Sequence, residues 1–186
     1  MKTRENIKTE IMDGKDLDRT VARLAHEIVE RNRGTENLVM VGIRTRGVPL
    51  AERLIDKISE IENRKPALGI LDITLYRDDL LKKMKQPRLQ QTDIPFDIDD
   101  KVVILVDDVL FTGRTVRAAM DALMDFGRPA KIQLAVLVDR DQRELPINAD
   151  FSGIKVTVGA GEEIRVKLHG VDDCDGVFVV DSANEG

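Results

Sequence analysis

Hydrophobic residues follow two different spacings along the chain. Apolar side chains recur at helical spacing in three segments, which predict amphipathic helices: 16–33, 48–62 and 115–127. Gly34 and Gly127 stand where the first and third of these helices should stop. Continuous apolar runs instead predict buried strands at 38–43, 67–75, 101–107 and 132–139. Beyond residue 150, short strands are expected in IKVTV and VFVV.

The alternation of buried strands with helices predicts an α/β domain. Its sheet should be mainly parallel and flanked by helices on both faces. Ligands of such folds bind beyond the carboxyl ends of the strands. Three expected strand ends carry unusual chemistry, and we expect them to converge: Gly42 to Gly47, Asp107 to Thr115, and Asp139 to Glu144.

Residues 76–100 interrupt this alternation. They are charged, contain Pro87 and Pro95, and show weak periodicity. We interpret 77–91 as a long mobile connection, because loops of this length inside a compact domain are usually functional.

Composition and charge narrow the class of protein. With 42% hydrophobic and 34% charged residues, the chain is typical of a soluble globular protein. A net charge of −5 argues against nucleic-acid binding driven by bulk charge, although a local basic face remains compatible with it. Cys174 is the single cysteine, so no intrachain disulfide is possible. No apolar stretch has the length of a signal-peptide core or a membrane span, and we expect a cytoplasmic protein with no membrane partner.

The most informative stretch is VVILVDDVLFTGRTV, residues 102–116. We expect Asp107 and Asp108 to emerge at the carboxyl end of its strand, where two adjacent carboxylates need hydroxyl donors, a cation, or both. Thr112-Gly113-Arg114-Thr115 then leads into a helix, whose free amides favour an anion. A ribose 5-phosphate unit with Mg²⁺ would satisfy both halves.

Three well-known acidic motifs explain the acidic pair less well than a sugar-phosphate site does. A Walker B strand also ends in acids, but the chain has no GxxxxGK[ST] motif. The acidic pair of a response regulator would follow the first strand, and a haloacid-dehalogenase loop needs D-x-D rather than D-D-V. A purely structural role as turn formers or helix caps leaves the adjacency of the two carboxylates unexplained.

VILVDDVLFTGRTV resembles the phosphoribosyl pyrophosphate (PRPP) signature of type I phosphoribosyltransferases. RLAHEIVERNRG, VGIRTRGVPLAERL, LDITLYRDDL and VLVDRDQRELPI resemble one branch of that family, the bifunctional pyrimidine operon attenuation regulators and uracil phosphoribosyltransferases. The resemblance covers roughly residues 16–150 in the same order. It implies a single phosphoribosyltransferase domain over residues 1–186. A flexible lid would span about 76–91, and a small hood would form from the N-terminal segment and about 139–186.

The resemblance also implies roles for particular residues. Asp107 and Asp108 would be catalytic, holding the ribose hydroxyls and lying near a Mg²⁺ ion that is bound through PRPP rather than by direct side-chain ligation. The full PRPP-binding set would be Asp107, Asp108, Val109, Phe111, Thr112, Gly113, Arg114 and Thr115. The pyrophosphate would contact Arg44, Thr45, Arg46, Gly47 and Arg77, of which Arg77, at the root of the lid, would also be catalytic. The base would lie beside Val138, Asp139 and Arg140.

The implied activity is the reaction of uracil with PRPP to give UMP and pyrophosphate. Nucleotide-dependent binding to a messenger leader is the implied regulatory activity, with a homodimer or higher homo-oligomer as the expected assembly. Candidate RNA-binding positions are Arg19, Arg23 and Arg143, with further basic residues at Lys82, Lys83, Lys85 and Arg88. Two alternatives stay open: an RNA-binding regulator with vestigial catalysis, and a phosphoribosyltransferase for a purine or orotate.

The sequence departs from the family pattern at two places. Asp141-Gln142 stands where the family usually has Gly-His, and IKVTVGAG follows Gly153 where the family typically has a Gly-Lys-Asn-Ile/Val-Pro-Thr segment. Both departures fall near the expected base site or on the expected RNA face.

Overall fold

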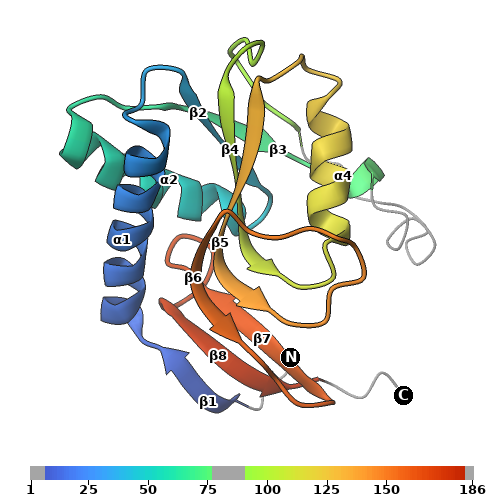
Figure 1. The fold of residues 1–186 in the computed structure, drawn as a ribbon. Helices are drawn as coiled ribbons and strands as arrows, with labels where there is room; N and C mark the ends of the chain where they lie inside the picture. Colours follow the sequence, from blue (N-terminus) through green and yellow to red (C-terminus); the bar gives the residue numbers. More distant parts are fainter. Residues whose placement is uncertain (1–6, 77–90, 183–186) are drawn as a thin grey trace.

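The computed structural model describes residues 7–76 and 91–182, and its larger sheet has five strands (Figure 1). The strand order is β3 (Ala67–Leu71), β2 (Leu38–Ile43), β4 (Val102–Leu110), β5 (Lys131–Arg140) and β6 (Phe151–Val156). Every neighbouring pair in this sheet is parallel. The predicted α/β fold with a parallel sheet is therefore confirmed.

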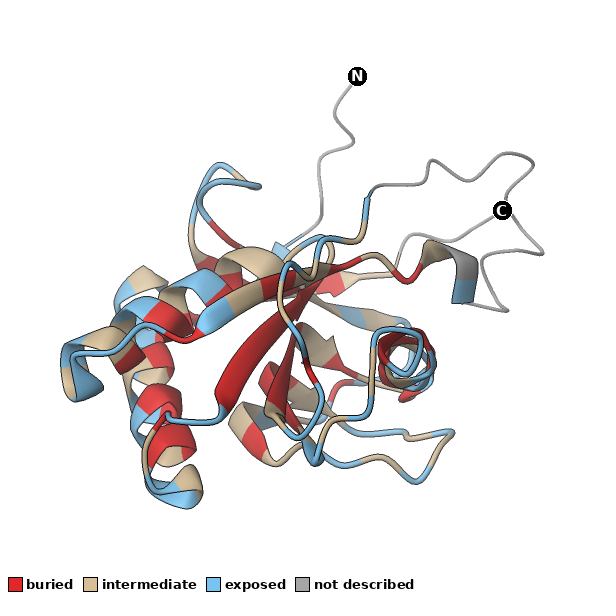
Figure 2. Ribbon diagram, turned by 90° about the horizontal axis from the view of Figure 1, so that it is seen from above, coloured by how far each residue is buried: buried red, intermediate tan, exposed pale blue. Residues whose placement is uncertain are grey.

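Helices cover both faces of this sheet. α1 (Gly14–Asn32) and α2 (Gly47–Glu62) pack on one face, and α4 (Arg114–Leu123) packs on the other (Figure 1). Side chains alternate between the two cores, so that Met40 of β2 belongs to the α1/α2 side and Val41 to the α4 side. Burial on both faces explains the continuous apolar strand sequences, and Figure 2 shows these strands buried between the helices.

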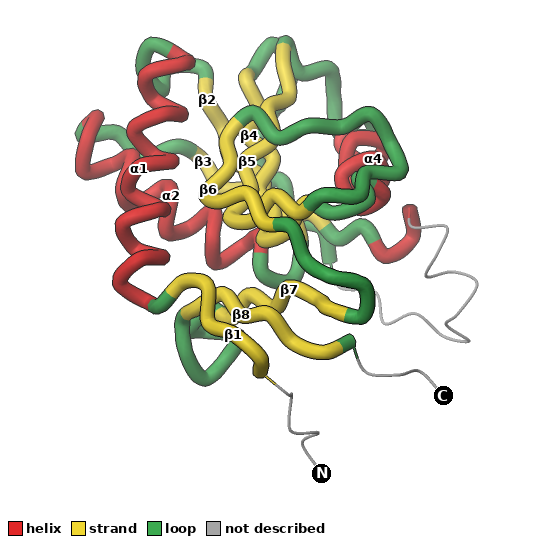
Figure 3. Tube along the Cα trace, turned by 60° about the horizontal axis from the view of Figure 1, so that its bottom comes forward, coloured by secondary structure: helices red, strands yellow, loops and turns green. Residues whose placement is uncertain are grey.

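A second, antiparallel sheet has the order β1 (Ile7–Met12), β8 (Gly176–Asp181) and β7 (Glu162–Lys167). It lies beyond the carboxyl ends of β4 and β5 (Figures 1 and 3). Continuous apolar runs predict neither β1 nor β7. IKTEIM of β1 is mostly exposed, and EEIRVK of β7 has the charged and apolar alternation of a strand that is buried on one face only. β6 joins the larger sheet, where it pairs with β5.

Three predicted element ends are wrong. β4 does not end at the acidic pair but continues to Leu110, because its backbone keeps pairing with β5 through Asp107↔Val136 and Leu110↔Asp139. β3 ends at Leu71 rather than at residue 75. The Asp72 carboxylate accepts hydrogen bonds from the Thr74 amide and hydroxyl, and the chain turns into a short 3-10 helix, Thr74–Tyr76. α4 ends at Leu123, and residues 124–126 form a turn before Gly127.

The predicted mobile connection lies mostly outside the described residues. The chain on its two sides is joined, since Ile70 and Asp93 exchange backbone hydrogen bonds of 2.7 and 2.8 Å. Among residues 7–76 and 91–182, no helix combines the length and apolar character that crossing a membrane requires.

Candidate active site

The carboxyl ends of β2, β4 and β5 bring together the three segments whose convergence the sequence predicts. The turn after β2 approaches β4 so closely that a Cβ on Gly47 would lie 2.3 Å from the Val106 carbonyl oxygen and 3.3 Å from the Asp107 Cα. The segment after β5 reaches the loop after β4, where the Glu144 and Leu145 amides donate to the Thr112 carbonyl at 3.0 and 3.1 Å. The expected convergence is confirmed.

Asp107 and Asp108 lie within β4, at the level of the Gly47 turn. Asp107 is only 6% exposed, and its carboxylate accepts a 2.9 Å hydrogen bond from the Asp108 amide. Asp108 is half-buried and accepts a bond of the same length from the Val109 amide. A nearly buried carboxylate beside a half-buried one favours ligands that carry hydroxyl donors or a cation.

A cavity of about 590 Å³ lies next to this pair, and its lining starts at Val109. Residues 109–116 line it together with Glu144 and Glu163, so the start of α4 forms part of its wall. Gly113 has a φ of 92°, a backbone conformation that glycine adopts readily, and α4 has no side-chain cap there. The first turn of α4 therefore lines a space in which backbone amides of a helix start can bind an anionic group.

Thr112, in the loop after β4, and Arg114, the first residue of α4, contact the chain around them. The Arg114 Nε lies 2.5 Å from the Glu144 carboxylate, and the Arg114 amide lies 3.3 Å from the Thr112 hydroxyl oxygen. Thr115 and Val109 are half-buried. All members of the predicted PRPP-binding set thus occupy one continuous stretch of β4, loop and α4.

The Arg44–Gly47 turn joins the larger sheet to the second sheet. The Arg44 amide donates to the Leu71 carbonyl at 3.0 Å, and the Arg44–Thr45 peptide is cis. Arg46 makes two hydrogen bonds to Asp172, of 2.9 and 2.8 Å, whereas Thr45 is exposed. Arg77, the remaining member of the predicted pyrophosphate set, lies outside the described residues.

The Arg46 guanidinium, through its hydrogen bonds, lowers the pKa of Asp172 below its ordinary value of 3.8. Stability contributed by such a carboxylate is present above pH 3.8 and is lost as the pH falls through the folded-state pKa. Asp172→Asn should therefore lower the free energy of unfolding by about 1–3 kcal/mol at about pH 7, and by less below pH 3.8. Thermal unfolding at several pH values measures this, with Asp56→Asn as the control, because Asp56 takes part in an exposed ion pair that contributes little. A difference that stays constant with pH would contradict it.

The predicted base-binding residues lie at the end of β5. Val138 is fully buried, while Asp139 and Arg140 are half-buried. The Arg140 guanidinium lies over the Phe111 ring, 3.9 Å from the ring centroid. This cation–π contact links the end of β5 to the loop after β4.

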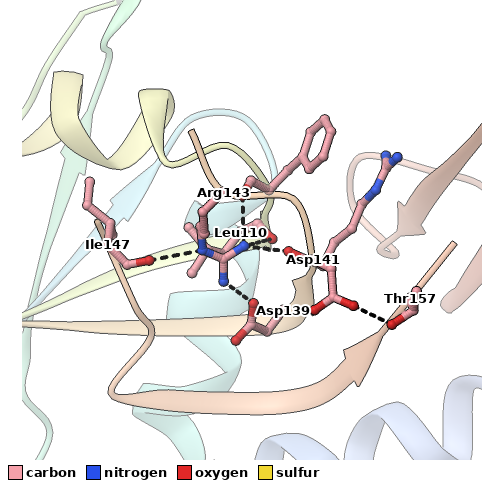
Figure 4. Close-up of polar contacts among 8 residues, drawn as sticks. Leu110, Asp139, Asp141, Arg143, Ile147 and Thr157 are labelled. Carbon is pink, nitrogen blue, oxygen red and sulfur yellow. Dashed lines mark hydrogen bonds and ion pairs between the residues drawn. The ribbon is translucent and has the colours of Figure 1, made fainter. Parts of the chain in front are cut away.

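The three predicted RNA-binding arginines have different surroundings. Arg19 of α1 has a 79% exposed side chain and pairs with Asp16 at 3.3 Å. Arg23, also on α1, contacts Glu27 and the Gly153 carbonyl, each at 2.5 Å. Arg143 is only 21% exposed, and its guanidinium contacts several groups of its own chain (Figure 4). Lys82, Lys83, Lys85 and Arg88 lie outside the described residues.

Two features of the site have no clear signal in the sequence. Asp172 and Glu163 come from the second sheet and its connections, which the strand pattern does not predict; the acidic turn VDDCD is the available hint of the former. The two departures from the family pattern also meet, since the Asp141 carboxylate accepts a hydrogen bond from the Thr157 hydroxyl (Figure 4).

The chain is similar to known phosphoribosyltransferases, as the geometry of the site would lead one to expect. Residues 8–167 match the family model described as "Phosphoribosyl transferase domain". "Bifunctional protein PyrR" of Pelotomaculum thermopropionicum is 55% identical over 176 residues, covering 95% of this chain and 97% of that protein. The protein of the same name from Deinococcus deserti is 55% identical over 174 residues, covering 94% and 95%.

Solved structures share the fold at low sequence identity. The hypoxanthine phosphoribosyltransferase of Trypanosoma cruzi superposes with a TM-score of 0.73 at 15% identity, covering 94% of this chain and 97% of that one. The hypoxanthine phosphoribosyltransferase of Staphylococcus aureus gives 0.71 at 17% identity, covering 95% and 94%. This chain therefore belongs to the phosphoribosyltransferase family and, within it, to the bifunctional PyrR proteins.

Proposed function

We propose that this protein transfers the phosphoribosyl group of PRPP to uracil, forming UMP and pyrophosphate with Mg²⁺. The observation that carries the proposal is the acidic pair of β4, which leads directly into a cavity lined by the start of α4. A sugar phosphate needs two kinds of partner in its site. Its hydroxyls need hydrogen-bond acceptors at one end, and its phosphate needs anion-binding amides at the other.

The arrangement of these residues suggests how the reaction would be assisted. Asp107 and Asp108 accept hydrogen bonds from the ribose hydroxyls, while Thr112 to Thr115 hold the 5-phosphate through amides and hydroxyls. Displacement of pyrophosphate from the anomeric carbon builds positive charge on the sugar and negative charge on the leaving group. Arg44 and Arg46, with Arg77, supply positive charge for that leaving group, and the end of β5 orients the base.

We expect Mg²⁺ to be bound mainly by oxygens of PRPP, close to the acidic pair. Among the described residues, no group of three or more His, Cys, Asp or Glu side chains could hold a metal ion by itself. The donors that Asp107 and Asp108 offer are hard carboxylate oxygens, which suit an ion that keeps waters and substrate oxygens in its shell. Bound in this way, the ion would neutralise charge on the departing pyrophosphate.

The activity is tested by product formation from labelled PRPP with a panel of bases. We expect UMP from uracil, and its formation should stop when Mg²⁺ is removed with a chelator. Turnover of hypoxanthine, guanine or orotate with none of uracil would overturn the substrate assignment while leaving the enzyme class in place.

The regulatory half of the proposal is binding to the leader of a pyrimidine messenger. Its support is the similarity to the bifunctional PyrR proteins and the exposed Arg19 on α1. In a homodimer, two copies of α1 could form one basic face despite the acidic net charge. RNA affinity should then rise with UMP and fall steeply with salt. An RNA affinity that changes neither with UMP nor with ionic strength would contradict this role and favour an enzyme without RNA binding.

A further inference from the structure

The guanidinium of Arg143 is the centre of a polar cluster between two loops (Figure 4). Its Nε donates to the Ile147 carbonyl at 2.9 Å, and one terminal nitrogen donates to the Phe111 carbonyl at 2.7 Å. The same nitrogen contacts the Arg140 carbonyl and, at 3.5 Å, the Leu110 carbonyl. The other terminal nitrogen donates to the Asp139 carboxylate.

These acceptors belong to segments that must cooperate in the proposed reaction. Leu110 and Phe111 end β4 and begin the loop expected to hold the 5-phosphate, whereas Asp139 and Arg140 end β5 beside the expected base. Ile147 lies where the chain returns toward β6. One side chain therefore joins the sugar-phosphate half of the site to the base half.

Residues 141–149 are held unevenly, because Ile147 and Ala149 pack against the core on the α4 side whereas the first residues of the segment have no such packing. Asp141, Gln142, Glu144, Pro146 and Asn148 are exposed, and no residue of this segment is fully buried. The exposed part around Asp141 and Gln142 has few apolar contacts, so polar contacts contribute most to its order. A planar guanidinium with five donors suits this role, whereas a lysine ammonium has three and cannot reproduce the geometry.

We propose that Arg143 is a positioning residue, which holds the 139–147 segment against the loop after β4 and so keeps the base site assembled. This inference rests on the proposed function. When only a fraction of molecules has the binding-competent arrangement, the apparent dissociation constant rises by the inverse of that fraction. Loosening the cluster therefore weakens binding of the base, while saturating substrate restores the ordered arrangement.

Other contacts also tether the segment. The Glu144 and Leu145 amides donate to the Thr112 carbonyl, and Asp141 and Thr157 form a further, weaker tether. The Thr157 hydroxyl donates to the Asp141 carboxylate, and the Asp141 amide lies 3.4 Å from the Val156 carbonyl oxygen. Both side chains are exposed, so this tether should contribute less than the half-buried cluster of Arg143.

The decisive variant is Arg143→Lys, which keeps the charge and removes the planar fork. We expect the UMP dissociation constant, measured by calorimetry, and the uracil KM to rise together by about 10-fold. We expect kcat to stay within about 3-fold, and amide hydrogen exchange across residues 139–149 to accelerate. The matched control is Arg64→Lys, the same change at an exposed arginine in the turn before β3, which should alter none of these.

Several outcomes separate this role from others. Unchanged exchange and an unchanged UMP dissociation constant, with loss of RNA affinity alone, would overturn the positioning role and make Arg143 a phosphate contact. A lower kcat with unaltered KM would overturn it in favour of a purely structural role. Wild-type protein that makes no UMP would refute the proposed function, whereas accelerated exchange in Arg143→Lys would still support the tether itself. If the lysine variant does not fold, Asp139→Asn replaces it, since this change removes the carboxylate partner of Arg143; unchanged hydrogen exchange across residues 141–149 would then overturn the tether.

Discussion

Replacing Asp107 and Asp108 together by asparagine is expected to lower kcat/KM for PRPP by roughly 10²- to 10⁴-fold. Each carboxylate would lose a charge-assisted hydrogen bond to a ribose hydroxyl, worth about 1.5–3 kcal/mol, and each 1.36 kcal/mol is about tenfold in rate. Steady-state kinetics with uracil and PRPP measures the effect, and circular dichroism checks that the fold is retained.

A double control uses two exposed carboxylates outside the site. Asp56 pairs with Lys65 at 3.0 Å and Asp121 with Arg117 at 3.5 Å, both on helix surfaces. Asp56→Asn with Asp121→Asn changes the net charge by the same amount, and it should leave kcat/KM within about 2-fold, since exposed ion pairs contribute little. If the Asp107/Asp108 variant stayed as active as this control, the assignment of the ribose contacts would be wrong.

Gly47→Ala is expected to inactivate the protein by a different route. The new Cβ would lie 2.3 Å from the Val106 carbonyl oxygen, so the turn after β2 must move away from β4. This separates Arg44 and Arg46 from the acidic pair. A displacement of about 1 Å within a site can cost about 10²-fold in rate. Overpacking should also lower stability by about 1–3 kcal/mol, a fall in Tm of about 2–12 °C for a chain of this size.

Gly14→Ala is the matched control for this substitution. Gly14 begins α1, and its added Cβ would lie 3.4 Å from the Asp175 Cβ, which is an ordinary contact. The variant should keep full activity and equal or slightly higher Tm, because alanine loses less backbone entropy on folding. Equal activity of the two variants would show that the close approach of Gly47 to β4 is not required.

The strands of the larger sheet can be predicted well from the sequence, whereas β1 and β7 of the second sheet cannot, for physical reasons. Residues 38–43 form a strand buried on both faces, which requires a continuous apolar run, and such runs are easy to recognise. β1 and β7 lie in a sheet with exposed and charged positions and contain no continuous apolar run, so the short alternation in β7 is the available signal. The predicted end of β4 is wrong because Asp107 and Asp108 look like a strand end, although backbone pairing with β5 does not depend on side-chain polarity.

The candidate site is also only partly predictable. Asp107, Asp108 and the 111–115 loop form a contiguous motif, which can be recognised in the printed sequence. The partners of Arg143 are mostly backbone carbonyls, which every residue offers, so no sequence pattern could indicate that cluster. Asp172 meets Arg46 across 126 residues of chain, a pairing that only the tertiary structure brings about.

The strand order of the second sheet has a consequence for synthesis of the protein. Its central strand, β8, pairs with β1 on one side and β7 on the other, and the Ile7↔Val180 pair joins nearly opposite ends of the described chain. A nascent chain can therefore assemble the five parallel strands as soon as residue 156 has left the ribosome, but β1 must wait for β8. The Arg44–Gly47 turn, too, gains its contact with Asp172 only after residue 172 has been synthesised. A product truncated before residue 172 could keep the motif of β4 and still lack the anchor of that turn, so synthesis through residue 172 is a condition for a complete site.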